Sequence, residues 1–366
     1  MMLSAQSIVE VIQSVETNSA VSDLNFKEGE PAWHRIVGKL KRIPNAPVID
    51  MSHLSAFLNQ LEPQLGLTAQ KIEDLLAKKG DVDLVITLGG RRYRGSIFRT
   101  DNKKIEIVLR KLEDTIRPLH SLNLPDHWVQ LLSRTKGLLI VTGATGSGKS
   151  TTLASSIEYL NETREGHIIT LEDPIEVLFK NKKCLIDQRQ IGPDAKDFSS
   201  GLRASLRQDP DIILIGELRD FETVKIALDA ANTGHLVLAT LHTMNAKQSI
   251  ERITSFFPAE SREWAQQLLS QVLLGVLSQV LIPHISKPER VLVSELMVNT
   301  RQVMSAIREG NTNQIANAMD TGSKDGHVLM NKSFSLYVKQ KIIHAEDAIQ
   351  ASYDPSQLLK ELTNAI

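Results

Sequence analysis

Residues 137–151 read GLLIVTGATGSGKST, and this stretch decides the fold. It begins with an apolar run at 137–141 and continues into the pattern G-x-x-x-x-G-K-[ST], the phosphate-binding P-loop. Glycines let the backbone curl so that several N–H groups face one anion, and a helix that starts near Gly148 adds the positive end of its dipole. The stretch therefore predicts a strand, a phosphate-binding loop and a helix in succession.

Nucleotide phosphates are expected to contact the whole loop. Within it, Lys149 has the length to reach the β- and γ-phosphates, and the Ser150 hydroxyl can bind Mg²⁺. The motif alone does not separate an ATPase from a GTPase or a small-molecule kinase. The predicted binding residues are Gly143, Ala144, Thr145, Gly146, Ser147, Gly148, Lys149, Ser150 and Thr151.

Apolar runs alternate with helix-length segments after the first third of the chain. Short, nearly continuous apolar strands separated by helices are typical of a parallel sheet that is buried on both faces. This pattern predicts an α/β domain over residues 127–366 with a helical C-terminal part. The expected strands are 137–141, 167–171, 212–215 and 235–241, and the strongest later helical signals are 261–281, 300–308 and 327–340.

The helix-like and strand-like stretches of residues 1–115 predict a smaller α+β domain in the N-terminal part. Turn signals at Gly89-Gly90 and Asp101-Asn102 break its last strand-like region, 81–112. Two prolines between Arg117 and Pro125, without a clear period, indicate a linker over 116–126. Before the linker we expect helices at 4–17, 51–61 and 68–78 and extended chain at 22–48.

Composition excludes several classes of protein. The 366 residues carry 42 basic and 43 acidic side chains, so the charge balance gives no support to a protein that coats nucleic acid. A single cysteine, Cys184, allows neither an intramolecular disulfide nor a cysteine-rich zinc site. The N-terminus lacks the features of a secretory signal, and no apolar run approaches the length of a membrane span. We expect a cytoplasmic protein, which could still work at a membrane surface through a partner.

Acidic residues follow two of the predicted strands. The segment TLEDPIE at 170–176 ends the strand 167–171, and DIILIGELRD at 211–220 resembles a Walker B strand in which Glu217 would hold Mg²⁺. Ligands of open α/β sheets gather at the carboxyl ends of strands, so a carboxylate here can position or deprotonate an attacking water. A solvated acidic turn is the alternative interpretation of the first segment.

Two histidines flank the last predicted strand. His235 and His242 are seven residues apart, which places them on opposite faces and argues against a shared metal ion. His242, at the carboxyl end, could sense the γ-phosphate, while a structural histidine is the alternative.

Arg203 and Arg207 share one helical face, and further arginines crowd the first domain. Each arginine either lies on a solvated face or closes over phosphates from another domain or subunit.

Four segments in this order resemble the PilT-type ATPases of type IV pili, within the secretion-ATPase superfamily. They are the loop at 143–151, the acidic segment at 170–176, the Walker B segment at 209–220 and the histidine segment at 233–243. The resemblance implies an N-terminal PAS-like domain, a RecA-like P-loop core and a ring of six subunits. It also implies ATP as the nucleotide, with Mg²⁺.

The resemblance assigns roles by position. Glu176 matches the family's catalytic glutamate, and Glu217 matches the Walker B glutamate. His235 and His242 match its histidine pair. Arg203 and Arg207 match arginines near the subunit interface, and Arg94, Arg99 and Arg110 fall where the N-terminal domain contributes arginines toward the nucleotide.

The function that the resemblance implies is ATP hydrolysis that powers pilus retraction through an inner-membrane, PilC-like platform protein, without nucleic acid. One segment departs from the family: residues 302–309 keep Arg308 and Glu309 of the A-I-R-x-L-I-R-E pattern, but Met304 replaces an arginine. A pilus assembly or type II secretion ATPase is an alternative, although those relatives commonly carry a four-cysteine zinc insert. A weakly catalytic accessory ring subunit is another.

Overall fold

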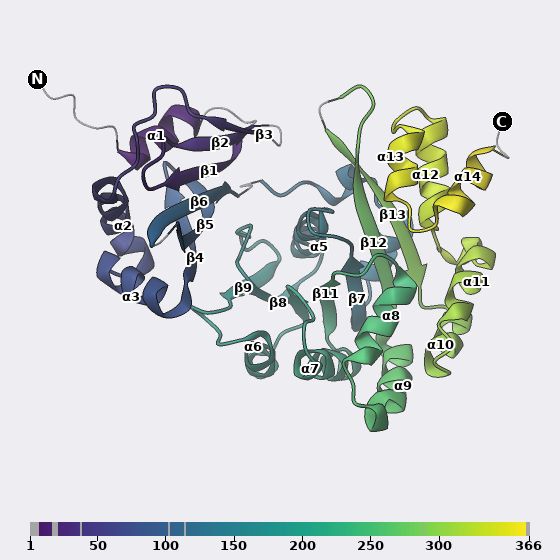
Figure 1. Cartoon of the computed structure of the whole chain (residues 1–366). Coiled ribbons are helices and arrows are strands. Elements are labelled where there is room, and N and C mark those ends of the chain that lie inside the picture. The colour runs from purple at the N-terminus through teal and green to yellow at the C-terminus, as the bar shows by residue number, and fades with distance from the viewer. Residues whose placement is uncertain are drawn as a thin grey trace, which may run out of the picture. The chain divides into compact units, whose positions relative to one another are not determined.

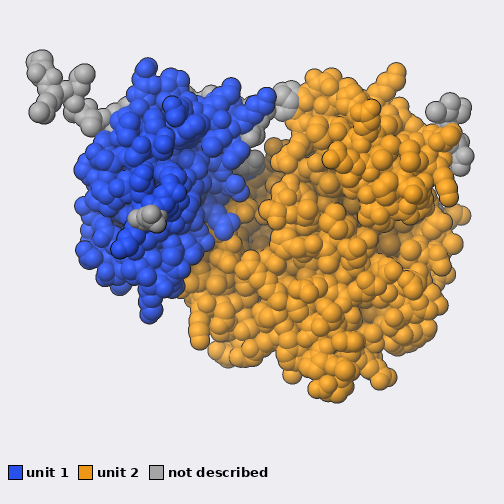
Figure 2. Space-filling view, viewed as in Figure 1, with its two compact units in different colours: residues 1–115 blue, residues 116–366 orange. Residues whose placement is uncertain are grey.

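The chain divides into two compact units, residues 1–115 and 116–366 (Figure 2). The computed structural model describes residues 7–16, 21–36, 39–101, 103–112, 115–287 and 289–363. Each unit has a hydrophobic core of its own. In the described part of the chain, no helix combines the length and the apolar character of a membrane span.

The first unit is a six-stranded antiparallel sheet packed with three helices (Figure 1). The sheet order is β3-β2-β1-β6-β5-β4. Gly89 and Gly90 both have positive φ, as a tight β4–β5 hairpin requires. The strands are β1 (Val21–Lys27), β2 (Trp33–Ile36), β3 (Lys39–Arg42), β4 (Asp81–Leu88), β5 (Arg91–Thr100) and β6 (Lys104–Lys111), and the helices are α1 (Ile8–Glu16), α2 (Met51–Leu65) and α3 (Ala69–Lys79). The α+β prediction for this unit agrees with these elements.

The second unit is built on a seven-stranded sheet in the order β13-β12-β7-β11-β10-β8-β9. All neighbouring strands are parallel except β13, which pairs antiparallel with β12. The central strands β7, β10 and β11 are buried along their whole length, as continuous apolar runs predict. The bounds are β7 (Gly137–Thr142), β8 (Gly166–Glu172), β9 (Cys184–Gln190), β10 (Ile212–Ile215), β11 (Leu236–Leu241), β12 (Leu273–Pro283) and β13 (Arg290–Val298).

Helices cover both faces of this sheet (Figure 1). Alternate residues of β7 serve the two faces: Leu139 and Val141 pack with α5, and Leu138 and Ile140 join the core on the side of α7 and α9. One face carries η1 (Leu119–Leu122), α4 (Asp126–Leu132) and α5 (Lys149–Thr163). The other carries α6 (Phe198–Ser205), α7 (Phe221–Asn232), α8 (Ala246–Ser255), η2 (Ala259–Ser261), α9 (Arg262–Val272), α10 (Arg301–Arg308) and α11 (Asn313–Thr321).

The C-terminal helices form a separate core with the far ends of β12 and β13. Ile282 and Val293 of these strands pack with Phe334 and Ile343. Three-residue η3 (Ser323–Asp325) precedes this group, which consists of α12 (Met330–Lys339), α13 (Ala345–Ala351) and α14 (Pro355–Thr363).

Two predictions about element type and place need correction. The helix expected at 261–281 ends at Val272, and the chain continues as strand β12. A short apolar run is compatible with a helix or a strand. Here the run is a strand because it pairs with β7 on one side and with β13 on the other. The predicted linker also belongs to the second unit: Leu119 and Leu122 of η1 are buried in the core that contains α5. Strands β9 and β13 are not among the predicted elements.

Candidate functional site

The phosphate loop connects buried strand β7 to helix α5. Gly143, Gly146 and Gly148 have φ values of 145°, 80° and 91°, which side chains other than glycine rarely adopt. A Cβ on Gly143 would also lie 2.3 Å from the Gln279 carbonyl oxygen and 2.6 Å from Ser147 Oγ. The backbone conformation therefore requires glycine at all three positions, and at Gly143 the lack of space requires it as well. These glycines leave the loop amides around one concave turn.

Lys149 folds back over this loop. Its Nζ donates hydrogen bonds to the carbonyl oxygens of Gly143, at 2.8 Å, and Ala144, at 3.1 Å. Burial lowers the pKa of Lys149, and the negative charges of Glu217 and Glu176 oppose that shift. The structure thus brings both predicted carboxylates within electrostatic reach of the loop lysine.

Glu217 follows β10 and pairs with one residue of another strand and one of its own segment. Its Oε2 lies 3.3 Å from His242 Nε2, at the carboxyl end of β11, and 2.8 Å from Arg219 Nε. Arg219 also reaches Asp173 Oδ2, at 3.5 Å. Three strands thus deliver a carboxylate, a histidine and an acidic turn to one edge of the sheet, as the parallel topology dictates.

The first acidic residue of the segment 170–176, Glu172, is half-buried. Glu172 Oε1 accepts hydrogen bonds from Thr170 Oγ1, at 2.7 Å, and Gln188 Nε2, at 3.1 Å. Burial raises the pKa of Glu172, and these bonds, together with one from the backbone amide of Glu176, oppose the shift. The bond to its backbone amide ties Glu176 to the end of β8.

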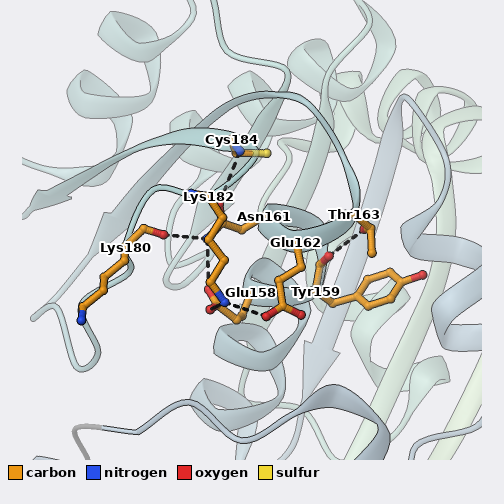
Figure 3. A network of polar contacts seen from close by, with 8 residues as sticks. All are labelled: Glu158, Tyr159, Asn161, Glu162, Thr163, Lys180, Lys182 and Cys184. Atoms are coloured by element: carbon orange, nitrogen blue, oxygen red, sulfur yellow. Dashed lines mark hydrogen bonds and ion pairs between the residues drawn. The ribbon is translucent and has the colours of Figure 1, made fainter.

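Asn161 of α5 anchors the chain just before β9 (Figure 3). Its Nδ2 donates to the carbonyl oxygen of Lys180 at 2.8 Å, and its Oδ1 accepts from the amide of Lys182 at 3.1 Å. Lys182 Nζ adds ion pairs of 2.6 Å to Glu158 and Glu162. The chain between β8 and β9, which carries Glu176, is therefore fixed to the helix that follows the phosphate loop.

Three predicted site residues of the second unit have their contacts away from the carboxyl edge of the sheet. His235 stands at the amino end of β11, with Nδ1 3.0 Å from the Ala230 carbonyl oxygen. His242 lies at the opposite end of β11, as the spacing of seven residues predicted, so within one chain His235 is not beside the phosphate loop. Its predicted contact with the nucleotide stays a prediction. Arg203 pairs with Glu222, and Arg207 donates to the Arg203 carbonyl at 3.2 Å. A role for these arginines at a subunit interface stays a prediction.

The arginines of the first unit lie on β5 and β6. Arg94 and Arg110 oppose each other in the β5–β6 register, and Arg99 opposes Ile105. Arg110 Nε bonds Asp23 Oδ1 at 2.7 Å, and Asp23 is buried. Their predicted contact with a nucleotide is not tested within the unit and stays a prediction.

Two side chains that the sequence did not indicate support the phosphate loop. Gln279 of β12 is buried and donates from Nε2 to the Ser147 carbonyl at 2.9 Å. Arg290 of β13 reaches the Gly146 carbonyl at 3.4 Å. Both belong to strands that the sequence analysis did not predict, so no sequence signal could have linked them to the loop. Arg219, by contrast, lies in the Walker B segment itself and could have been singled out.

The predicted magnesium ligands have suitable chemistry. Ser150 is exposed in the first turn of α5, and Glu217 lies near Lys149. Hydroxyl and carboxylate oxygens are the ligands that Mg²⁺ prefers, and it commonly takes one or two of them together with substrate phosphates. Among the described residues, no group of three or more His, Cys, Asp or Glu side chains is placed to hold a metal ion.

Comparisons with known proteins match this architecture. Residues 73–353 match the family described as "Type II/IV secretion system protein". The chain is 41% identical over 332 residues to the uncharacterized protein YggR of Escherichia coli, which covers 89% of this chain and 97% of YggR. It is 36% identical over 335 residues to the type IV pilus retraction ATPase PilT of Pseudomonas aeruginosa, covering 91% and 95% of the two chains.

A solved structure agrees with the fold over nearly the whole chain. The crystal structure of the pilus retraction motor PilT with bound ADP has a TM-score of 0.85 and 38% identity, and the match covers 97% of this chain and 99% of that one. The predicted resemblance to PilT-type ATPases, and the α/β class with a RecA-like core, are thereby confirmed. The chain belongs to the Type II/IV secretion system protein family.

Proposed function

We infer that this protein is an ATPase that powers the retraction of type IV pili. The observation that carries the inference is the convergence of Lys149, Glu176, Glu217 and His242 on the phosphate loop. Likeness to PilT over nearly the full length of both chains favours retraction over pilus assembly or type II secretion. A chain with the loop lysine and both glutamates in place also gives little support to an accessory subunit without catalysis.

The residues of the site divide the chemistry among themselves. The amides of the loop and the Lys149 ammonium would bind the β- and γ-phosphates of ATP. Ser150 and Glu217 would hold Mg²⁺, which neutralises charge on the phosphates when it is bound. Glu176 would orient the attacking water and accept its proton, and His242, beside Glu217, would contact the γ-phosphate side of the site.

Assembly and location follow from the same inference. The arginines Arg94, Arg99, Arg110, Arg203 and Arg207 would complete the nucleotide site across domains or subunits of a homohexamer. The ring would work in the cytoplasm at the inner membrane, against a PilC-like platform protein. Nucleic acid is not an expected partner, because the charge of the chain is balanced.

Two experiments test the proposal. The purified protein should release phosphate from ATP in a Mg²⁺-dependent reaction, and chelation of the metal should stop it. Deletion of the gene should leave surface pili present or more numerous while pilus disassembly and twitching are lost. A cell without pili would instead identify an assembly ATPase, and pili that retract normally would remove the chain from the motor.

A further inference from the structure

Glu295 is a fully buried carboxylate that the proposed chemistry does not use. It lies on β13, opposite Ser278 of β12, which in turn lies opposite Thr142 at the end of β7. The three residues form a polar row across the sheet at the edge where the phosphate loop begins. Such a group in an apolar interior needs hydrogen-bond partners that offset the loss of water.

The partners of Glu295 come from four separate segments. Oε1 accepts from the Ala246 amide at 3.0 Å and lies 3.4 Å from Ser278 Oγ, and Oε2 accepts from Tyr353 Oη at 2.6 Å. The Met330 amide is a further donor. Ala246 and Met330 are the first residues of α8 and α12, so two helix N-termini meet one carboxyl group. Burial raises the pKa of Glu295, and the hydrogen bonds from these donors oppose that shift.

On one side, Glu295 holds the turn that carries His242. We define the His242 turn as residues 242–245, between β11 and α8. Thr243 Oγ1 fixes its start by contacts of 2.7 Å with Thr142 Oγ1, beside the phosphate loop, and with Ser249 Oγ of α8. The Ala246 amide on Glu295 fixes its end. His242 therefore stands on a turn that is clamped at both ends.

On the other side, Glu295 holds the C-terminal helices. Met330 begins α12, and Tyr353 lies between α13 and α14. The helices also bond to β13 without Glu295: Ser333 Oγ donates to the Ser294 carbonyl at 2.8 Å. What sets Glu295 apart is that a single side chain bonds these helices and the His242 turn.

We propose that Glu295 is a positioning residue that joins the His242 turn to the C-terminal helices, so that both move together when the nucleotide state changes. The proposal rests on the inference that this site turns over ATP. A force-generating ATPase must pass a change at the γ-phosphate to distant elements, and a buried carboxyl group with four hydrogen-bond donors is a rigid connection. The C-terminal helices α12–α14 would then be the elements that respond to His242.

Steady-state kinetics of Glu295→Gln give the first test. The glutamine side chain has the same shape as glutamate, but its NH₂ group replaces one of the two oxygens. This group faces donors that need an acceptor, so the His242 turn shifts. We expect kcat to fall by up to about tenfold, the loss expected when His242 itself is removed, while the ADP dissociation constant stays within about twofold. In a His242→Ala background, Glu295→Gln should add less than about twofold. If the losses of kcat in the two single variants multiply in the double variant, the two residues act independently and the proposal is overturned.

Two further variants keep the test independent of folding defects. Tyr353→Phe removes only the hydroxyl on Oε2 and should lower kcat in the same non-additive way, by a smaller factor. Ser333→Ala is the matched control, because it removes a bond between α12 and β13 that bypasses Glu295, and it should leave kcat within about twofold. Equal losses in Ser333→Ala and Glu295→Gln would show general loosening and would overturn the proposal.

Hydrogen exchange separates this inference from the proposed function. In the wild-type protein, a non-hydrolysable ATP analogue should slow amide exchange, relative to ADP, both at 243–249 and at 330–339. In Glu295→Gln, or in Tyr353→Phe if the first variant does not fold, the response at 330–339 should shrink while that at 243–249 persists. A wild-type protein that shows the paired response but no ATP turnover would refute the proposed function alone. A wild-type response confined to 243–249 would refute the coupling alone.

Discussion

The two edges of the large sheet carry the same kinds of side chain and use them differently. At the carboxyl edge, His242 lies 3.3 Å from Glu217, next to the phosphate loop and its lysine. Near the amino edge, His167 Nε2 lies 2.8 Å from Asp187, and its Nδ1 lies 3.2 Å from the Asp209 carbonyl. A histidine beside a carboxylate therefore says little by itself. Its place relative to the loop that can bind phosphate assigns it a function.

The largest effect should come from the loop itself. Lys149→Ala removes the one ammonium that lies over the loop carbonyls, and it leaves the γ-phosphate charge without its main partner in the loop. We expect ATP turnover to fall about a hundredfold to a thousandfold, as for other preorganised charge-stabilising donors. Phosphate release by the purified protein measures this. Turnover within about threefold of wild type would remove Lys149 from the site.

Glu176→Gln should separate binding from chemistry. The amide cannot accept the proton of the attacking water, so kcat should fall at least about tenfold, and a loss of about a hundredfold is typical of general-base catalysis. ADP and ATP should still bind with near-normal affinity, which fluorescence titration of a labelled nucleotide can follow. A variant that hydrolyses ATP at the wild-type rate would exclude Glu176 as the base.

A matched pair of histidine variants tests the comparison between the edges directly. His242→Ala should lower kcat about tenfold, because it removes a side chain that contacts Glu217 at the nucleotide edge. His167→Ala should leave kcat unchanged within about twofold and change only thermal stability. Similar losses of kcat in both variants would mean that the edges are not distinct in function.

Gln279→Leu tests whether the contact from β12 sets the shape of the phosphate loop. It leaves the buried Ser147 carbonyl without its donor, at a cost of about 1–3 kcal/mol, so the loop should lose its preset shape. We expect the dissociation constant of ADP to rise about tenfold, which corresponds to about 1.4 kcal/mol. Isothermal titration with adenosine is the control, since a ligand without phosphates should bind as it does to wild type. Equal weakening of both ligands would argue for a general packing defect.

The smallest effect concerns pH. Burial raises the pKa of Glu172 in the folded protein, so between the unfolded and the folded pKa the folded state binds more protons than the unfolded state. That contribution to stability is present at acidic pH and is lost as the pH rises through the folded pKa. Glu172→Gln should therefore gain thermal stability relative to wild type on going from about pH 4.5 to pH 7. A difference that does not change with pH would contradict this account.

The sequence predicted the parts of the site that lie in local motifs. The phosphate loop needs particular glycines, and the strands before Glu217 and His242 are apolar runs of distinctive length, so β7, β8, β10 and β11 were located correctly. The spacing of His235 and His242 likewise predicted that they lie at opposite ends of β11, and only His242 lies at the edge of the phosphate loop.

The rest of the site depends on contacts between distant segments. Gln279 is 132 residues from Ser147, and its run of apolar neighbours fits a helix as well as a strand until β7 and β13 enclose it. Glu295 and Ala246 are 49 residues apart, and β13 itself was not predicted. Residues such as Gln279 and Glu295 hold the backbone of the site from distant strands, so no sequence spacing indicates their role.

Imaging of labelled pili in living cells tests the central claim most directly. A strain that lacks the gene should be complemented with the wild-type chain, with Glu176→Gln or with His167→Ala, and retraction events per cell should be counted. The account predicts frequent retraction with the wild type and with His167→Ala, and almost none with Glu176→Gln. Retraction at the wild-type rate with Glu176→Gln, or in the strain without the gene, would contradict the account.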